Sequence, residues 1–387
     1  MKKRIFIIAS YVSDPSTMGG NTKIILELIN NAPSTYKFII LTSEPETFSK
    51  LTNLSIELID LNFHFKKMSY FSHFFEINFM FFRLIKYFKK FKINTSDYVY
   101  TVSDFWPDVL PVIILKPIFK FKTIFSLFLF IPDPVNNLFK KYQFPFIKYI
   151  IYFIYQRIIF FLMKFSANYF LITNESDFKY FPEDMHQKIL AIYGGVNIEQ
   201  IPKSKSLNKK YDAVYCGRLH EQKGLIQLLK IWKKCIQLNS SLKLAIIGNG
   251  EKYFELKLKN YANKLGINKN IDWLGYVNNH KKYRIYNQSK VLVHTSVYDN
   301  NGMVAAESLC SGLPVIMNDL PELKSIYTTG CIKIENSSIE KYAKMLYKLI
   351  MDEKFRNKIA PKNNDINQLR KFWAWESRSK LFYKLIS

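Results

Sequence analysis

The sequence predicts an α/β protein made of two doubly wound, Rossmann-like domains that face each other across a cleft. Short apolar segments alternate with helical patterns along the chain, which is the order of a parallel sheet with helices on both faces. A polar stretch at residues 197–210 separates two such series. The length of 387 residues also exceeds that of one ordinary domain, since domains average roughly 150 residues.

The first series precedes the polar stretch. Short apolar runs predict strands at 4–9, 37–42, 55–61, 98–102, 122–130, 167–173 and 189–192. The glycine pair Gly19-Gly20 follows the first strand and precedes a helical pattern at 22–30. The basic residues 1–4 could open a signal peptide, but the apolar run after them is too short, so a buried strand fits better.

The second series begins at residue 211. Strands are predicted at 211–216, 242–248, 271–274, 291–294 and 314–317, and helices at 224–239, 251–265, 281–288 and 302–311. In doubly wound sheets ligands bind beyond the carboxyl ends of the strands. The cleft between the two domains is therefore the expected site.

Composition limits the classes of partner. The 56 Lys+Arg residues exceed the 31 Asp+Glu residues and give a formal charge of +25, which favours nucleic acid, an anionic membrane or phosphate-bearing ligands. No nucleic-acid-binding module accompanies this charge, so we expect no specific nucleic-acid partner. The four Cys and six His are scattered, which indicates buried thiols in a reducing compartment and no metal site.

A strand, loop and helix at 291–311 form the most informative segment. The loop delivers the start of a helix to the carboxyl end of a strand, and the backbone N–H groups of Gly302, Met303 and Val304 suit an anion there. Glu307 lies inside the same helix among apolar residues, where a carboxylate needs solvent or a partner such as a ligand's hydroxyl pair.

A simpler interpretation of this segment has equal weight. Asp299 or Asn301 then caps the helix, and Glu307 pairs with a nearby lysine.

The turn at 217–224 lies between a strand and a helix. Arg218 and Lys223 are five residues apart in it, so both cations could converge on a diphosphate; a solvated basic turn is the alternative. Glycine turns at Gly217 and Gly248-Asn249 would allow close backbone approach to a ligand, as would Gly19-Gly20. Each is weak evidence alone, since glycines usually make turns.

Together these segments resemble glycosyltransferase family 4. The family hallmark, a carboxylate and a glutamate separated by seven residues, occurs as Asp299 and Glu307 and is followed by Gly312-Leu-Pro-Val. The segments 217–224 (Gly-Arg-Leu-x-x-x-Lys-Gly), 247–250 (Ile-Gly-x-Gly), 273–277 (Trp-Leu-Gly-Tyr-Val), 193–197 (Tyr-Gly-Gly-Val-Asn) and the first glycine pair also match.

The resemblance implies a GT-B fold and the retaining, metal-independent transfer of a sugar, without a cofactor, from a UDP- or GDP-sugar to a glycan or lipid-linked acceptor. Arg218 and Lys223 would hold the diphosphate, Glu307 the ribose and Asp299 the sugar. The expected donor-binding residues are Gly19, Gly20, Gly217, Gly248, Asn249, Asn301, Gly302, Met303, Val304 and Glu307. Residues 1–197 would form the acceptor-side domain, 198–365 the donor domain, and 366–387 a helix that crosses back to the first domain.

Two departures from the family pattern affect these expectations. Asp299 replaces the usual glutamate, which shortens its reach by about 1.5 Å. The family often has a histidine near 125–134, where this chain has none and offers only Asp133. A catalytically impaired scaffold, a basic nucleic-acid-binding protein and a phosphorylase therefore remain alternatives.

Two Phe-rich stretches bear on location. Residues 70–91 predict a basic amphipathic helix, with Glu76, Arg83 and Lys86 on the face opposite Phe74, Phe82 and Phe88. Such a helix suits an anionic membrane surface or, equally, the protein core. The most apolar stretch, 146–165, carries Lys148, Gln156, Arg157 and Lys164 on one helical face, so it predicts no transmembrane helix. We expect a cytoplasmic protein, peripheral on the cytoplasmic membrane face.

Overall fold

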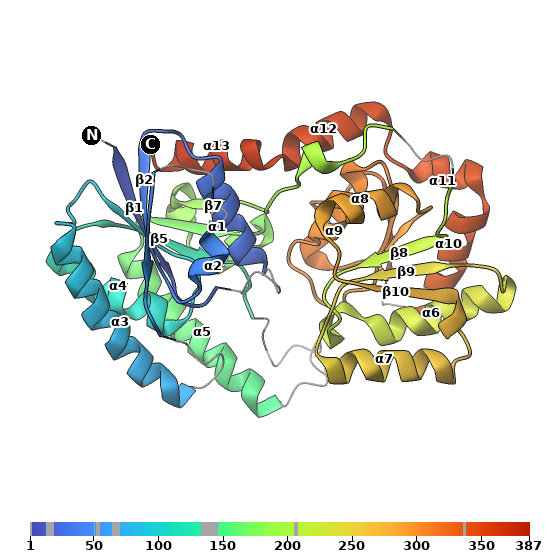
Figure 1. Cartoon of the computed structure of the whole chain (residues 1–387), viewed down its shortest axis with the longest axis horizontal. Helices are drawn as coiled ribbons and strands as arrows, with labels where there is room; N and C mark the ends of the chain where they lie inside the picture. Colours follow the sequence, from blue (N-terminus) through green and yellow to red (C-terminus); the bar gives the residue numbers. More distant parts are fainter. Residues whose placement is uncertain are drawn as a thin grey trace. The chain divides into compact units, whose positions relative to one another are not determined.

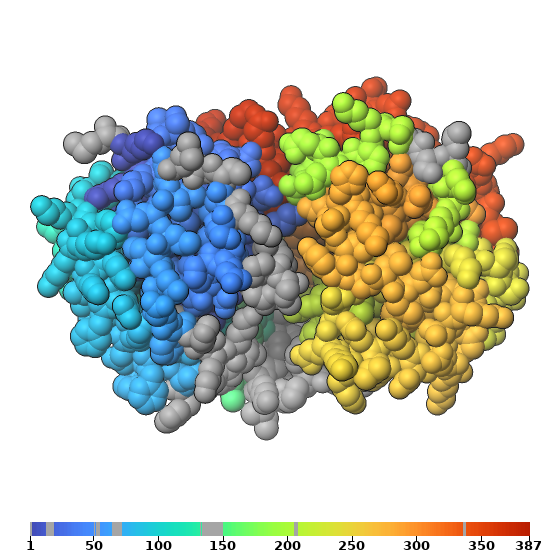
Figure 2. Space-filling model, in the orientation of Figure 1, coloured from blue at the N-terminus to red at the C-terminus, as the bar shows by residue number. Residues whose placement is uncertain are grey.

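The computed structural model describes residues 2–12, 19–49, 51, 55–63, 70–131, 133, 146–204, 208–335 and 338–387, with the backbone alone for 70–71 and 146–149. The chain folds as two compact units (Figure 1; Figure 2). The first contains Met1–Gly194 together with Trp375–Ser387, and the second contains Gly195–Ala374.

The first unit is built on a seven-stranded parallel sheet with the strand order β3-β2-β1-β4-β5-β6-β7. Its strands are β1 (Lys3–Ala9), β2 (Tyr36–Thr42), β3 (Ile56–Asp60), β4 (Tyr98–Thr101), β5 (Lys122–Leu127), β6 (Tyr169–Ile172) and β7 (Ile189–Ala191). In β1, Ile7 lies opposite Ile40 on one side and Tyr100 on the other. All three are fully buried, as is usual for parallel strands that helices cover on both faces.

Helices cover both faces of this sheet (Figure 1). The strand order runs one way from β1 to β3 and the other way from β4 to β7, and right-handed crossovers therefore place the two sets of helices on opposite faces. One face carries α1 (Gly20–Asn30) and α2 (Pro45–Phe48), with α13 (Trp375–Leu385) packed on α1. The other carries α3 (Tyr70–Lys90), α4 (Trp106–Phe119) and α5 (Phe146–Ser166).

The second unit has a six-stranded parallel sheet with the order β10-β9-β8-β11-β12-β13. Its strands are β8 (Ala213–Cys216), β9 (Leu244–Ile247), β10 (Ile271–Gly275), β11 (Leu292–His294), β12 (Val315–Asn318) and β13 (Cys331–Ile334). Its helices are α6 (Leu225–Leu238), α7 (Lys252–Lys264), α8 (Asn279–Asn287), α9 (Met303–Cys310), α10 (Ile339–Met351), α11 (Glu353–Ile359) and α12 (Asn363–Trp373). The predicted class of two doubly wound α/β domains is confirmed.

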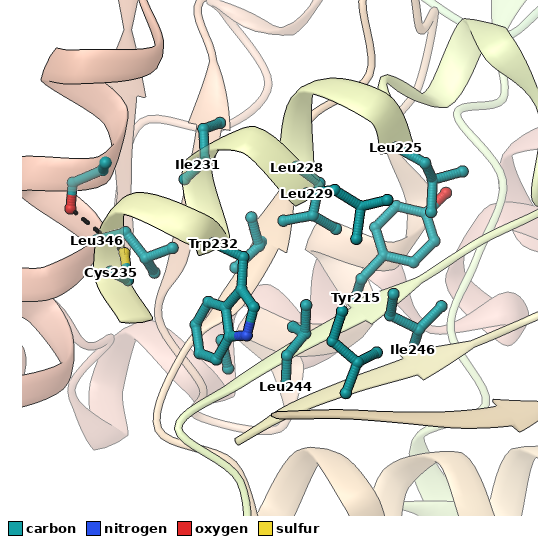
Figure 3. Packing of buried hydrophobic residues seen from close by; sticks show 14 of the residues in the cluster. Tyr215, Leu225, Leu228, Leu229, Ile231, Trp232, Cys235, Leu244, Ile246 and Leu346 are labelled. Carbon is teal, nitrogen blue, oxygen red and sulfur yellow. Dashed lines mark hydrogen bonds between the residues drawn. The ribbon is translucent and has the colours of Figure 1, made fainter. Parts of the chain in front are cut away.

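The core of the second unit follows from the helical spacing of apolar residues in α6. Leu228, Leu229 and Trp232 recur at three- and four-residue intervals and point from α6 onto the sheet (Figure 3). They meet residues such as Leu244 and Ile246 in one buried cluster. This packing fixes the strands whose carboxyl ends carry the candidate site.

The C-terminal segment differs from the single final helix expected at 366–387. The chain leaves the helical conformation at Ala374 (φ −56°, ψ 133°) and divides into α12 and α13. Trp373 stacks on Tyr327 in the second unit, with ring centroids 5.9 Å apart. Trp375 packs in the core of the first unit with Phe382 and Tyr383. Only α13 therefore belongs to the first unit.

None of the helices in the described part of the chain combines the length and the hydropathy that a membrane-spanning segment requires.

The two tryptophans should therefore stabilise different units. Each is nearly or fully buried, so replacement with alanine should cost about 3–5 kcal/mol. Trp375→Ala should raise amide hydrogen exchange in β1, β2 and α1, whereas Trp373→Ala should raise it around Tyr327 and α12. Exchange measured by mass spectrometry distinguishes the two, and the same pattern from both variants would contradict the division at Ala374.

Candidate active site

The candidate site lies where the strand order of the second sheet reverses, between β8 and β11. The loops that follow these two strands lie side by side beyond their carboxyl ends. Gln222 of the first loop accepts a hydrogen bond from the Val297 N–H through its carbonyl (2.9 Å) and donates from its side-chain amide to the Tyr298 carbonyl (3.0 Å). Such a reversal is the usual ligand position in a doubly wound sheet.

Lys223 and Asp299 join the two loops by a salt bridge. Lys223 Nζ lies 2.7 Å from Asp299 Oδ2, and the two side chains are 24% and 14% exposed. Lys223, the residue predicted to bind the diphosphate, and Asp299, the residue predicted to bind the sugar, are thus in direct contact in this structure. A substrate that uses both must share or displace this ion pair.

Asp299 also organises the start of α9. Its Oδ1 accepts hydrogen bonds from the backbone N–H groups of Gly302 (3.0 Å) and Asn301 (3.3 Å). This agrees with the simpler interpretation of the sequence, in which Asp299 serves the helix N-terminus. The Gly302 N–H is therefore already bonded within the protein. Met303 and Val304 are half-buried in the first turn of α9, and an anion bound by their backbone N–H groups stays a prediction.

His294, the last residue of β11, forms a hydrogen bond with the Asp299 carboxylate. Its Nε2 lies 3.1 Å from Asp299 Oδ2, and because a carboxylate only accepts hydrogen bonds, this nitrogen is the donor. Burial would raise the pKa of Asp299, but the Lys223 ammonium and the His294 hydrogen bond outweigh it and hold that pKa well below its usual value. Asp299 is therefore an anion at neutral pH.

Glu307 is buried within α9 and pairs with Lys282 of α8. Lys282 Nζ lies 2.7 Å from Glu307 Oε1, and the side chains are 10% and 5% exposed. Burial lowers the pKa of Lys282, but the nearby Glu307 carboxylate reverses the effect and leaves the pKa raised. Glu307, the residue predicted to bind the ribose, thus lies in an ion pair with a lysine, as the simpler interpretation of the sequence expected.

The remaining predicted residues of this unit lie in the loop after β8 and in the loop after the neighbouring strand β9. The Arg218 side chain is exposed, and its carbonyl accepts a hydrogen bond from Tyr215 (3.2 Å). Gly248 has φ +131°, and a Cβ there would lie 2.0 Å from the Gly217 carbonyl oxygen. Gly217 has φ +151°, and a Cβ there would lie 3.1 Å from the Tyr215 hydroxyl, so both glycines have a structural reason to be glycine. Asn249 is exposed.

The predicted residues of the first unit give less information. Gly19 precedes α1, and a Cβ added to Gly20 would meet nothing within 4 Å. The packing around Gly20 thus does not require glycine, which leaves room for the predicted close approach of a ligand. Asp133 is exposed, and residues 132 and 134 of the segment 125–134 lie outside the described residues.

Two residues of the site were missed by sequence reasoning. His294 ends its strand five residues before Asp299, a signal that could have been used. Lys282 lies 25 residues before Glu307, in a helix rich in Lys and Arg, and nothing in the sequence distinguishes it from its neighbours.

The buried pair predicts an asymmetric mutational response. Lys282→Met leaves the Glu307 carboxylate buried without its cation and should lower the free energy of unfolding by about 3–5 kcal/mol, whereas Lys282→Met with Glu307→Leu should recover most of this loss. The exposed pair Lys37–Glu57, with side chains 42% and 36% exposed, is the control, and Lys37→Met should cost at most about 1 kcal/mol. Urea denaturation of the four proteins checks this; equal losses in the single and double variants would contradict it.

Asp299 should contribute stability that is lost in acid. Its pKa is lower in the folded state than in the unfolded chain, so its contribution is complete above about pH 4 and disappears as the pH falls through the folded-state pKa. Asp299→Asn keeps an oxygen for the Gly302 N–H but loses the charge, at a cost of about 1–3 kcal/mol. The stability gap between wild type and variant should shrink from pH 5 to pH 3. A gap that stays constant would show that the charge does not matter.

Known proteins that are similar in sequence to this chain are described as glycosyltransferases. Residues 197–365 match the sequence family described as Glycosyl transferases group 1. An uncharacterized glycosyltransferase of Methanocaldococcus jannaschii is 28% identical over 219 residues, which are 51% of this chain and 53% of the relative. The capsular polysaccharide biosynthesis glycosyltransferase CapH of Staphylococcus aureus is 29% identical over 188 residues, 48% of this chain and 44% of the relative. The chain thus matches about half the length of these relatives.

Solved structures match over nearly the whole chain. Sucrose-phosphate synthase of Thermosynechococcus elongatus has a TM-score of 0.79 at 13% identity and covers 99% of this chain and 98% of its own. Anabaena HepE, solved in complex with UDP and glucose, has a TM-score of 0.73 at 12% identity and covers 99% of both chains. The chain therefore has the GT-B fold, and its residues 197–365 match the group 1 glycosyl transferases.

Proposed function

We propose that this chain is a retaining, metal-independent hexosyltransferase of glycosyltransferase family 4, which transfers a sugar from a UDP- or GDP-sugar to a glycan or lipid-linked acceptor. The observation that carries the proposal is the meeting of the β8 and β11 loops, with Lys223 on Asp299 at the start of α9, inside the region that matches the group 1 glycosyl transferases.

Charge explains how such a site would receive a nucleoside diphosphate. Lys223 already holds one anion, the Asp299 carboxylate, in a setting that is three-quarters buried. A diphosphate at the start of α9 would offer Lys223 a second anion, and the exposed Arg218 could supply a bidentate contact. Asp299, relieved of part of this contact, would then accept hydrogen bonds from sugar hydroxyls. Arg218 and Lys223 together would stabilise the charge on the departing phosphate.

Glu307 has a place in the same scheme. Its Oε1 binds Lys282, which fixes the carboxylate in one orientation, so that Oε2 could take a hydroxyl of the ribose. Lys282 would then be a positioning residue for the nucleoside.

The comparisons support the donor class. HepE is described in complex with UDP-glucose, and CapH is described as acting in capsular polysaccharide biosynthesis. A glycan or lipid-linked acceptor for this chain is inferred from these likenesses and from the family resemblance.

The nucleotide can be identified by thermal shift. The full chain is heated with UDP, GDP and ADP and with their sugars, since a ligand at a hundredfold excess over its Kd stabilises the folded state by about 2.7 kcal/mol. A shift with UDP or GDP but not with inorganic phosphate supports the proposal. If none of the nucleotides or nucleotide sugars raised the melting temperature, a donor site in this chain would be refuted.

Arg218→Ala should then separate a working enzyme from an impaired scaffold. Because Arg218 is exposed, the variant should keep its melting temperature. We expect nucleotide affinity to fall about 10-fold or more and kcat for sugar transfer or donor hydrolysis to fall about 100- to 1000-fold.

Arg284→Ala, at an exposed arginine of α8, is the matched control and should change neither quantity. Wild-type protein that binds nucleotide but turns over no donor would favour the scaffold. The anomeric configuration of the product, read by NMR, tests retention, and activity that persists in EDTA tests metal independence.

A further inference from the structure

The helical layer of α3, α4 and α5 exposes large apolar side chains along its length. They come from all three helices: Phe74, Phe75 and Phe82 of α3, Ile114 and Ile118 of α4, and Ile151, Ile154, Ile158, Phe161 and Phe165 of α5. We call these side chains the apolar stripe. Soluble proteins rarely expose so many large apolar residues on one surface, and such a patch marks an interaction site.

Helix α5 carries apolar residues on its exposed side as well as on its buried side, where Ile159 and Met163 are fully buried. The stripe residues of α5 follow each other at intervals of three and four and so lie on one face, where they are 43–77% exposed. Gln156, in contrast, is 2% exposed. Its side chain binds the carbonyl of Leu129 and the N–H of Ile131. The fold thus places Gln156 inside and leaves the five apolar residues of the stripe outside.

Helix α3 likewise combines exposed apolar residues with a buried acidic one, which modifies the amphipathic pattern expected for 70–91. Glu76, expected on the polar face, is buried and accepts a hydrogen bond from the Tyr11 hydroxyl. Phe88, expected among the membrane-facing residues, is fully buried. Phe74 and Phe82 are 68% and 67% exposed. The exposed apolar residues therefore are not the ones that core packing requires.

The charge around the stripe is of one sign. Helices α3, α4 and α5 contain only two acidic residues, Glu76 and Asp108, and both are buried. Lys86, Lys89 and Lys90 of α3 are exposed. Because all three helices are crossovers between parallel strands, they run in the same direction, and their C-terminal ends lie at one edge of the layer. The exposed Lys120 follows α4 at that edge, where Phe119 of α4 and Phe88 of α3 are in ring contact, with centroids 5.5 Å apart.

We propose that the surface formed by α3, α4 and α5 lies on an anionic lipid bilayer, with the apolar stripe in the interface and the lysines at the C-terminal edge on the headgroups. Exposed apolar side chains beside an acid-free basic edge complement such a surface. A second copy of the chain is a poorer occupant, because a two-fold interface brings the same surface from both copies, and these three helices offer no exposed carboxylate to pair with the lysines. The inference does not rest on the proposed glycosyl transfer.

Vesicle flotation of the full chain tests the proposal. We expect binding to phosphatidylcholine vesicles that contain 30 mol% phosphatidylglycerol, weaker binding at high salt, and little binding to pure phosphatidylcholine, following the about 10 Å screening length at 0.1 M salt. The triple variant Lys86→Gln, Lys89→Gln, Lys90→Gln should bind about 100-fold more weakly. Its matched control, Lys252→Gln, Lys259→Gln, Lys264→Gln on α7, removes the same charge from exposed positions and should bind like wild type.

A second variant set tests the stripe itself. Ile154→Ser, Phe161→Ser, Phe165→Ser should keep the melting temperature, because these side chains are exposed, and should reduce vesicle binding by about 100-fold. Leu238→Ser, Tyr253→Ser, Leu256→Ser, exposed residues of the second unit, are the control.

Three results would overturn the proposal: no wild-type binding at low salt, equal losses in test and control variants, or lipid-free sedimentation in which the stripe variants convert a dimer to a monomer. The last result would assign the stripe to a second copy of the chain.

Discussion

The salt bridge between Lys223 and Asp299 is the interaction on which the candidate site depends. It joins the loop after β8 to the loop after β11 at the reversal of the strand order, and the same aspartate fixes the first N–H groups of α9. One carboxylate therefore sets both the approach of the two loops and the direction of the helix. An aspartate suits this work because its short side chain reaches its own backbone two and three residues on, a geometry that a longer glutamate satisfies less well.

The two ion pairs of the site explain why both carboxylates can stay charged in a mostly buried place. A lone buried carboxylate is costly, and a cation within hydrogen-bonding distance offsets that cost. Lys223 serves Asp299, and Lys282 serves Glu307. The pairs differ in exposure, since the second is more deeply buried than the first. The outer pair is thus the one that an incoming anion can reorganise, while the inner pair maintains the geometry.

The fold and half of the site were predictable from the sequence, for reasons that differ from residue to residue. Strands such as β1 and β11 are short apolar runs between turns, and their alternation with helical patterns predicts parallel sheets. Asp299 and Glu307 stand out because together they match the hallmark of a known family. Lys282 does not, because its partner comes from another helix, and contacts between distant segments leave no local pattern. The exposed face of α5 was missed because helical periodicity identifies two faces but not which one turns inward. The break at Ala374 was missed because no Gly or Pro marks it in the sequence.

The basic residues have different surroundings at the candidate site and on the outer surface of the layer formed by α3, α4 and α5. At the site, the cations of Lys223 and Lys282 are matched by carboxylates, and Arg218 is the exposed cation that faces an incoming anion first. In the layer of α3, α4 and α5, the carboxylates of Glu76 and Asp108 are buried, whereas the lysines at the C-terminal end of α3 are exposed. Unmatched charge beside exposed Ile and Phe side chains acts together with the hydrophobic effect at a lipid interface, and neither term alone gives stable attachment. The composition of the chain thus records two different uses of basic residues, one neutralised within the protein and one directed outward.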